Sequence, residues 1–186
     1  GLPRADAFER DLTMMMENCL DLTLAMTDLD RMMRANEEFG CEEGDRLLIK
    51  GGKPLTSGLK LDLQNIPDSL PALSVAAACA QGGTTFTGLD AVRLKETDRV
   101  AVMQSELGKM GASIEVGDDY MVVHGGKPLT GAKVESYHDH RIAMAMTIAG
   151  FFAEGETVVR DAECVAVTFP NFFELMGNMG ADVETK

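Results

Sequence analysis

The stretch Gly-Gly-Lys-Pro-Leu-Thr occupies residues 51–56 and returns unchanged at residues 125–130, an offset of 74 residues. A stretch of small and apolar residues follows each copy, at 70–80 and again at 142–153. Self-similarity at a fixed period is typical of a fold made of repeated supersecondary units. The sequence therefore predicts a repeat of about seventy residues.

Within one repeat we expect a helix, two strands, a second helix and a further strand. The apolar residues Val100, Met103 and Leu107 recur at helical spacing and predict one buried helix face. The segments 120–124 and 156–160 are short and rich in β-branched residues, which favours strands. The expected fold class is α/β (α+β).

We expect one domain over residues 1–186, with repeat copies at about 28–97 and 98–170 and a partial copy at 171–186. No Pro-, Gly- or Ser-rich linker divides the chain. The Gly-Gly-Lys-Pro stretch is read as a plain hairpin turn between strands.

The composition and net charge exclude some classes of function. Of the 186 residues 45% are apolar and 25% are charged, and the formal net charge is −13. Such a field does not favour binding to nucleic acid or to an anionic membrane. No apolar run is long enough to cross a bilayer. The four cysteines form no Cys-x-x-Cys pair, so we expect reduced, mostly buried thiols in a cytoplasmic protein. Any anionic ligand requires a local basic cluster.

Charged residues gather at three expected helix starts. Asp68 lies between two prolines ahead of an apolar helix, where it could simply cap that helix. Five of the seven residues in 93–99 are charged, and Lys95 and Arg99 lie four apart on one helix face. Like charges repel there, and the helix dipole disfavours each cation by about 0.3–1 kcal/mol. A solvated helix end with ion pairs is the alternative to an anion site.

The third start is the segment 137–144, in which Asp139 can cap a helix and Arg141 falls in its first turn. The His138-x-His140 pair lacks a third candidate ligand nearby, so we expect no metal and no cofactor.

Helix N-termini offer free N–H groups and a positive dipole to phosphate and carboxylate groups. Equivalent ends of repeated units tend to line one face, so we expect the three starts to meet. The expected basic cluster consists of Lys95, Arg99, His140 and Arg141. The carboxylates Asp68 and Glu96 would lie near the same anions, where general acid or base chemistry is possible.

The segments 93–99 and 139–144 resemble the two signature segments of the EPSP synthase family, the 3-phosphoshikimate 1-carboxyvinyltransferases. Residues 67–68 and 168–173 resemble two further markers of that family, and the likeness runs from about residue 28 to 183. The resemblance implies two domains, each of three βαβαββ units arranged as an inside-out α/β barrel. This chain would be the C-terminal part.

The resemblance also implies a reaction. The enolpyruvyl group of phosphoenolpyruvate would pass to the 5-hydroxyl of shikimate 3-phosphate, in the shikimate pathway of aromatic amino acid biosynthesis, with release of phosphate. The family's site lies in the cleft between the domains. The chain alone would then carry half a site and need the missing N-terminal half as its partner.

By position, the resemblance assigns catalysis to Asp68, Lys95 and Glu96. Asp68 and Lys95 would also contact shikimate 3-phosphate. The carboxylate and phosphate of phosphoenolpyruvate would be held by Arg99 and Arg141, with His140 alongside.

One departure from the family supports a different interpretation. Val167 stands where the family usually carries a lysine that contacts phosphoenolpyruvate. A degenerate, non-catalytic paralogue is therefore one alternative. A relative of the UDP-N-acetylglucosamine enolpyruvyl transferase is another, although the Lys-Glu-Thr-Asp-Arg run speaks against it. A purely structural repeat module is the third.

Overall fold

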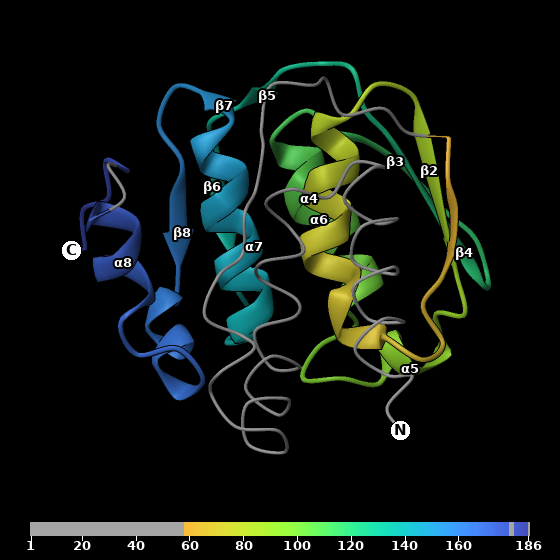
Figure 1. Ribbon diagram of the computed structural model, residues 1–186, viewed down its shortest axis with the longest axis horizontal. Coiled ribbons are helices and arrows are strands. Elements are labelled where there is room, and N and C mark those ends of the chain that lie inside the picture. Colours follow the sequence, from red (N-terminus) through yellow and green to blue (C-terminus); the bar gives the residue numbers. More distant parts are fainter. Residues whose placement is uncertain (1–57, 179–180, 186) are drawn as a thin grey trace, which may run out of the picture.

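The three longest helices of the described chain pack directly against one another: α4 (Leu70–Cys79), α6 (Arg99–Lys109) and α7 (His140–Phe151). The structure is a computed structural model and describes residues 58–178 and 181–185. All three helices begin at the same end of the molecule, the lower end in Figure 1. Predictions that fall on residues 1–57, including the first Gly-Gly-Lys-Pro copy, lie outside the described residues.

The sequence explains which helices are buried. Helix α4 is apolar on almost every side, and eight of its residues are buried. Ser74 lies among them without cost because its hydroxyl donates to the Leu70 carbonyl at 2.7 Å. Helix α6 is amphipathic, and the predicted face of Val100, Met103 and Leu107 is fully buried. The predicted helix face is confirmed.

A four-stranded sheet flanks the helices on one side (Figure 1). Its order is β1 (Lys60–Asp62), β2 (Gly83–Thr87), β4 (Tyr120–His124) and β3 (Ser113–Val116). The β1–β2 pair is parallel and the other two pairs are antiparallel. Phe86, Met121 and Val123 point from this sheet into the core and are fully buried.

The other described strands form two short parallel pairs. Strand β5 (Leu129–Thr130) pairs with β7 (Ala153–Glu154), and β6 (Lys133–Glu135) pairs with β8 (Val158–Arg160). The remaining described elements are short helices: η1 (Pro67–Ser69), α5 (Asp90–Arg93), η2 (Ala162–Val167) and α8 (Phe172–Asn178).

The repeat is visible in the strand register. In the unit β1–α4–β2, Lys60 pairs with Thr85, and in the unit β6–α7–β8, Lys133 pairs with Val158. The partner lies 25 residues on in both, and the two units are offset by 73 residues. The predicted order of helix, strand, strand, helix, strand is confirmed over 98–170, with the short strands β5, β6 and β7 added to it.

The second Gly-Gly-Lys-Pro stretch is not a hairpin turn, so that prediction is wrong. It joins β4 to β5, which belong to different sheets. Gly125 donates its N–H to the Gly82 carbonyl at 2.8 Å. A Cβ at Gly125 would overlap the carbonyl oxygens of Ala77 and Ala80 at the end of α4. Glycine is needed here for close helix packing rather than for pairing strands.

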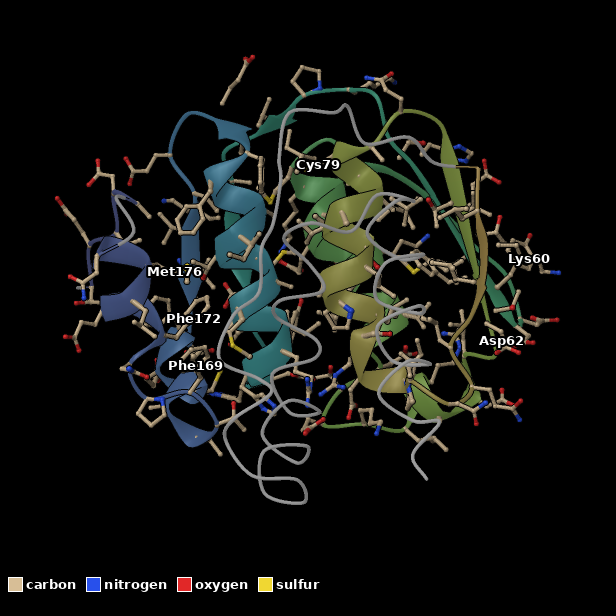
Figure 2. The ribbon with its side chains drawn as sticks, in the orientation of Figure 1. Lys60, Asp62, Cys79, Phe169, Phe172 and Met176 are labelled. Carbon is tan, nitrogen blue, oxygen red and sulfur yellow. The ribbon has the colours of Figure 1, made fainter. Side chains whose placement is uncertain are left out.

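Aromatic packing anchors the C-terminal segment. Phe172 is 1% exposed and makes edge-to-face contacts with Phe169 and Phe173. Phe169, Phe172 and Met176, labelled in Figure 2, lie where η2 and α8 pack against the core. Helix α8 opens the region where a partial third repeat is expected. Among the described helices, none has the length and apolar character needed to cross a membrane.

The close approach at Gly125 generates a stability prediction. Gly125→Ala forces a methyl group into the backbone at the end of α4, and overpacking of this kind costs about 1–3 kcal/mol. Gly108→Ala is the matched control, because its Cβ inside α6 meets nothing within 4 Å. It should stabilise the chain by about 0.5–1 kcal/mol through helix propensity. Urea unfolding measures both, and equal effects would contradict the packing role.

Candidate active site

Arg99 is the first residue of α6, and its side chain is 0% exposed. Its Nε donates to Asp139 Oδ2 at 2.7 Å, and its Nη2 donates to Asp139 Oδ1 at 3.2 Å. Its Nη1 donates to Asp68 Oδ1 at 2.7 Å. Its Nη2 also donates to Glu96 Oε2 at 2.6 Å. One buried guanidinium therefore binds three carboxylates, in the planar fork geometry to which arginine is suited.

Each carboxylate comes from a different helix start. Asp68 lies in η1, which runs directly into α4. Glu96 lies just before α6, and Asp139 is the N-cap of α7. The prediction that the three helix starts meet is confirmed, because Arg99 contacts all three.

The Asp139 carboxylate both caps α7 and pairs with Arg99. It is 0% exposed and caps α7 by accepting from the N–H groups of Arg141 at 2.9 Å and Ile142 at 3.4 Å. The same carboxylate accepts from Arg99 and from Thr97 Oγ1 at 3.3 Å. The predicted cap is confirmed. Burying an ion pair is favourable only when the remaining lone pairs are hydrogen-bonded, which is the case here.

Two further cations surround Asp68. Lys95 Nζ lies 3.1 Å from Asp68 Oδ1, and Arg141 Nη2 lies 3.8 Å from Asp68 Oδ2. Burial alone would raise the pKa of the Asp68 carboxyl, but Lys95, Arg141 and Arg99 together hold that pKa below its ordinary value of 3.8. Asp68 is therefore ionised at neutral pH.

The charges within this arrangement balance. The charge cluster consists of the cations Lys95, Arg99 and Arg141 and the carboxylates Asp68, Glu96 and Asp139. Lys95, Arg99 and Arg141 of the predicted basic cluster do lie together. Asp139 adds a carboxylate that was predicted only as a cap, so the cations and carboxylates of the described cluster are equal in number. The repulsion expected between Lys95 and Arg99 is relieved by carboxylates of the chain itself, and a bound anion is not needed to explain it.

The side chains of the candidate site differ in their exposed fractions. Arg99 and Asp139 are 0% exposed, whereas the side chains of Arg141 and Lys95 are 17% and 29% exposed. Asp68 and Glu96 are about half exposed. His140 is the half-buried first residue of α7. Lys95, Arg141, Asp68 and Glu96 are therefore at least partly exposed, whereas Arg99 is buried.

The loop before α7 holds an unusual backbone. Tyr137 and His138 both have positive φ, at 54° and 59°, which non-glycine residues rarely adopt. Ser136 is fully buried and donates to the Asp161 carbonyl at 3.0 Å, while its Oγ accepts from the His138 N–H at 3.1 Å. The Asp139 N–H closes the turn on the Ser136 carbonyl at 3.0 Å. Backbone strain of this kind is concentrated at functional sites.

Sequence reasoning missed part of this site. It treated Asp139 as a cap only, although capping residues with a second, buried partner are recognisable only once distant segments meet. It had no signal for the left-handed Tyr137 and His138, since glycine or asparagine would mark such positions. Within the described residues there is no group of three His, Cys, Asp or Glu side chains that could hold a metal.

Two solved structures with this fold are an EPSP synthase and an enolpyruvyl transferase. The EPSP synthase of Acinetobacter baumannii superposes with a TM-score of 0.67 and 37% identity, over 73% of this chain and 33% of that protein. The enolpyruvyl transferase NikO from Streptomyces tendae superposes with a TM-score of 0.61 over 90% of this chain and 38% of that protein. At 20% identity the second shows a shared fold alone.

Sequence comparison is more specific. The family model for EPSP synthase (3-phosphoshikimate 1-carboxyvinyltransferase) matches residues 13–176. The 3-phosphoshikimate 1-carboxyvinyltransferase of Methanocaldococcus jannaschii is 44% identical over 142 residues, covering 76% of this chain and 33% of that protein. The Halobacterium salinarum protein of the same name is 41% identical over 161 residues, covering 86% of this chain and 37% of that protein.

The chain belongs to the EPSP synthase family. It spans about a third of the length of the relatives that it matches.

The double role of Asp139 generates the second prediction. Asp139→Ala leaves the Arg99 guanidinium buried with fewer partners, and breaking a buried pair in this way costs about 3–5 kcal/mol. Asp98→Ala is the control, because Asp98 caps α6 in the same manner but is 40% exposed. Losing that cap, together with the partly exposed ion pair between Asp98 and Arg93, should cost about 1–2 kcal/mol. If urea unfolding shows the same loss for both variants, the Arg99–Asp139 pair contributes nothing beyond the cap.

Proposed function

We propose that the protein carrying this chain transfers the enolpyruvyl group of phosphoenolpyruvate to the 5-hydroxyl of shikimate 3-phosphate. The proposal rests on the charge cluster, found in a chain of this family. In this cluster two partly exposed cations and two half-exposed carboxylates lie around the buried Arg99. Both substrates are anions, and both require charged hydrogen-bonding partners.

Lys95 and Arg141 are the proposed direct anion ligands. Both side chains face the half-exposed carboxylate of Asp68, and both remain partly open to solvent. A substrate phosphate or carboxylate would share them with Asp68. Charge-assisted hydrogen bonds of this kind contribute about 1.5–3 kcal/mol each. His140 would lie alongside as a further donor, since it opens the same helix as Arg141.

Asp68 is the proposed base for the 5-hydroxyl. The hydroxyl oxygen forms a bond to C2 of phosphoenolpyruvate as its proton passes to Asp68, and the methylene carbon takes a proton from Lys95 or Glu96. The same group, Lys95 or Glu96, would then take a proton from the new methyl carbon while the C2–O bond to the phosphate breaks. This releases phosphate and forms the enol ether of the product. A lowered pKa makes Asp68 a weak base in the free chain. Two anionic substrates beside it would raise that pKa toward the useful range.

Arg99 is the least exposed of the proposed substrate ligands. It can bind a substrate anion only if that anion replaces one of the carboxylates that Arg99 already binds. Of its three carboxylates, Glu96 is the most exposed, at 49%. The carboxylate of phosphoenolpyruvate would replace Glu96 at Arg99 Nη2, which keeps the buried charge paired. The exchange would release Glu96 for proton transfer near the methylene carbon.

The fold supports a finer architectural proposal. The three long helices contact one another while the strands lie outside them, and the β1–α4–β2 arrangement repeats as β6–α7–β8. We infer that this domain is an inside-out α/β barrel of repeated units. The missing N-terminal half would supply the other wall of the cleft and its own substrate ligands.

A degenerate, non-catalytic paralogue is the second candidate. It is favoured by Val167, which stands where the resemblance implies a lysine that contacts phosphoenolpyruvate. Val167 ends η2 and is 81% exposed. An exposed valine offers no charge to a phosphate.

A chimaera tests the proposal. The part of this chain that aligns with the Methanocaldococcus jannaschii relative over 142 residues replaces its counterpart there, and phosphate release from shikimate 3-phosphate plus phosphoenolpyruvate is measured. We expect turnover, and we expect Asp68→Asn to lower kcat by about 10²–10⁴-fold through loss of the base.

The control for the chimaera is Asp90→Asn, an exposed position in α5 whose side chain takes part in none of the hydrogen bonds or ion pairs of the charge cluster, and it should leave kcat unchanged. A folded chimaera that releases no phosphate would contradict the proposed function. Recovery of turnover by Val167→Lys in that case would trace the loss to the missing lysine and favour the degenerate paralogue.

A further inference from the structure

Glu106 is a fully buried charged side chain that the proposed reaction does not use. It lies in α6 and accepts hydrogen bonds on both carboxylate oxygens. Lys109 Nζ reaches Oε1 at 2.8 Å and Oε2 at 2.6 Å, and Ser105 Oγ reaches Oε1 at 2.9 Å. Two more donors come from outside the helix: the Glu135 N–H at 2.9 Å and the Tyr137 hydroxyl at 3.2 Å.

These two outside donors are Glu135, the last residue of β6, and Tyr137, in the loop that runs from β6 into α7. The loop, residues 135–139, is therefore attached to α6 at both of its ends. Glu106 holds the Glu135 N–H and the Tyr137 hydroxyl, while Arg99 holds Asp139. Arg99 and Glu106 are seven residues apart, which is two helical turns, so both face the loop from the same side of α6.

The loop needs this attachment because of its backbone. Tyr137 and His138 occupy the left-handed region, and such conformations persist only where the surroundings over-determine them. Ser136 fixes the turn from within the loop, and Glu106 fixes it from α6. The loop ends at Asp139, which positions the first turn of α7 through its cap.

The ionised form of Glu106 suits the task. Burial alone would raise the pKa of its carboxyl, but hydrogen bonds from Lys109, from the Glu135 N–H and from Ser105 hold that pKa below its ordinary value. An ionised carboxylate accepts on both oxygens, so it binds α6 donors and loop donors at once. A neutral amide of the same shape must present N–H groups to one set of those donors.

We propose that Glu106 is a positioning residue for the candidate active site: through the loop at 135–139 it sets where Asp139 meets Arg99 and where α7 presents His140 and Arg141. Its effect on catalysis rests on the proposed function, whereas its effect on the loop does not. It contacts no residue of the charge cluster directly in the described hydrogen bonds.

The test compares Glu106→Gln with Glu115→Gln in the full chain. Glu115 is 68% exposed on β3 and serves as the matched control. Native-state hydrogen exchange is read at the Arg141 and Ile142 amides, which Asp139 caps, and at Met103 in the middle of α6. Glu106→Gln should speed exchange at the two capped amides at least tenfold more than at Met103. Glu115→Gln should leave the exchange rate unchanged at all three amides.

Equal acceleration at all three amides would overturn the proposal, because it would show a general loss of stability. No acceleration at the capped amides would overturn it as well. Tyr137→Phe covers the case in which Glu106→Gln fails to fold, since it removes one hydrogen bond to Glu106 and adds no donor. The same selective pattern, with a smaller ratio, is expected there.

A kinetic readout joins the exchange data to catalysis. In the active enzyme, Glu106→Gln should raise KM for phosphoenolpyruvate at least tenfold with a smaller change in kcat, because Arg141 is displaced from its anion. Hydrogen exchange that is faster at the two capped amides than at Met103, together with an unchanged KM, would overturn the catalytic part of the proposal. A parent enzyme with no transfer activity contradicts the proposed function, and the exchange ratio then decides the positioning role alone.

Discussion

The buried guanidinium of Arg99 is the constraint on which this structure depends. A charge at 0% exposure is tolerable only with close and complete pairing, and here the partners are Asp139, Asp68 and Glu96. Because those carboxylates come from three separate helix starts, satisfying one arginine fixes the relative positions of η1–α4, α6 and α7. The residues proposed to bind substrate lie on the same three starts, so the pairing that holds the fold together also arranges the site.

Helix α6 contacts the segment before α7 at two points along its length. Arg99 holds Asp139 at the beginning of the helix, and Glu106 holds the loop ahead of Asp139 two turns later. The left-handed residues Tyr137 and His138 lie between the two attachments. The partly exposed residues Lys95, Asp68 and Glu96 therefore lie above the buried pair of Arg99 and Asp139. In the proposed function, a substrate carboxylate would enter by replacing a protein carboxylate, so that it adds no net charge.

Local patterns in the sequence predicted what depends on local residues. The buried face of α6 and the cap at Asp139 were predicted from spacing and residue type, and the structure confirms them. The repeat of about seventy residues stays a prediction, which the matching registers of β1–β2 and β6–β8 support. The charge balance was not predicted, because Asp68 and Asp139 lie 31 and 40 residues from Arg99 in the chain. The turn at Gly125 was misjudged for the same reason: β5 finds its partner in β7, far along the chain. The roles of the site residues stay predictions that rest on family resemblance.

The unfolding free energy of Arg99→Lys tests the central claim most directly. Lysine keeps the charge but loses the planar fork that reaches three carboxylates, so the fork geometry and the charge are separated by one substitution. If Arg99 joins the helix starts through its separate donors, losing two of these charged hydrogen bonds should cost about 3–6 kcal/mol in urea unfolding. A variant within about 0.5 kcal/mol of the parent, the range of an ordinary surface substitution, would contradict the account.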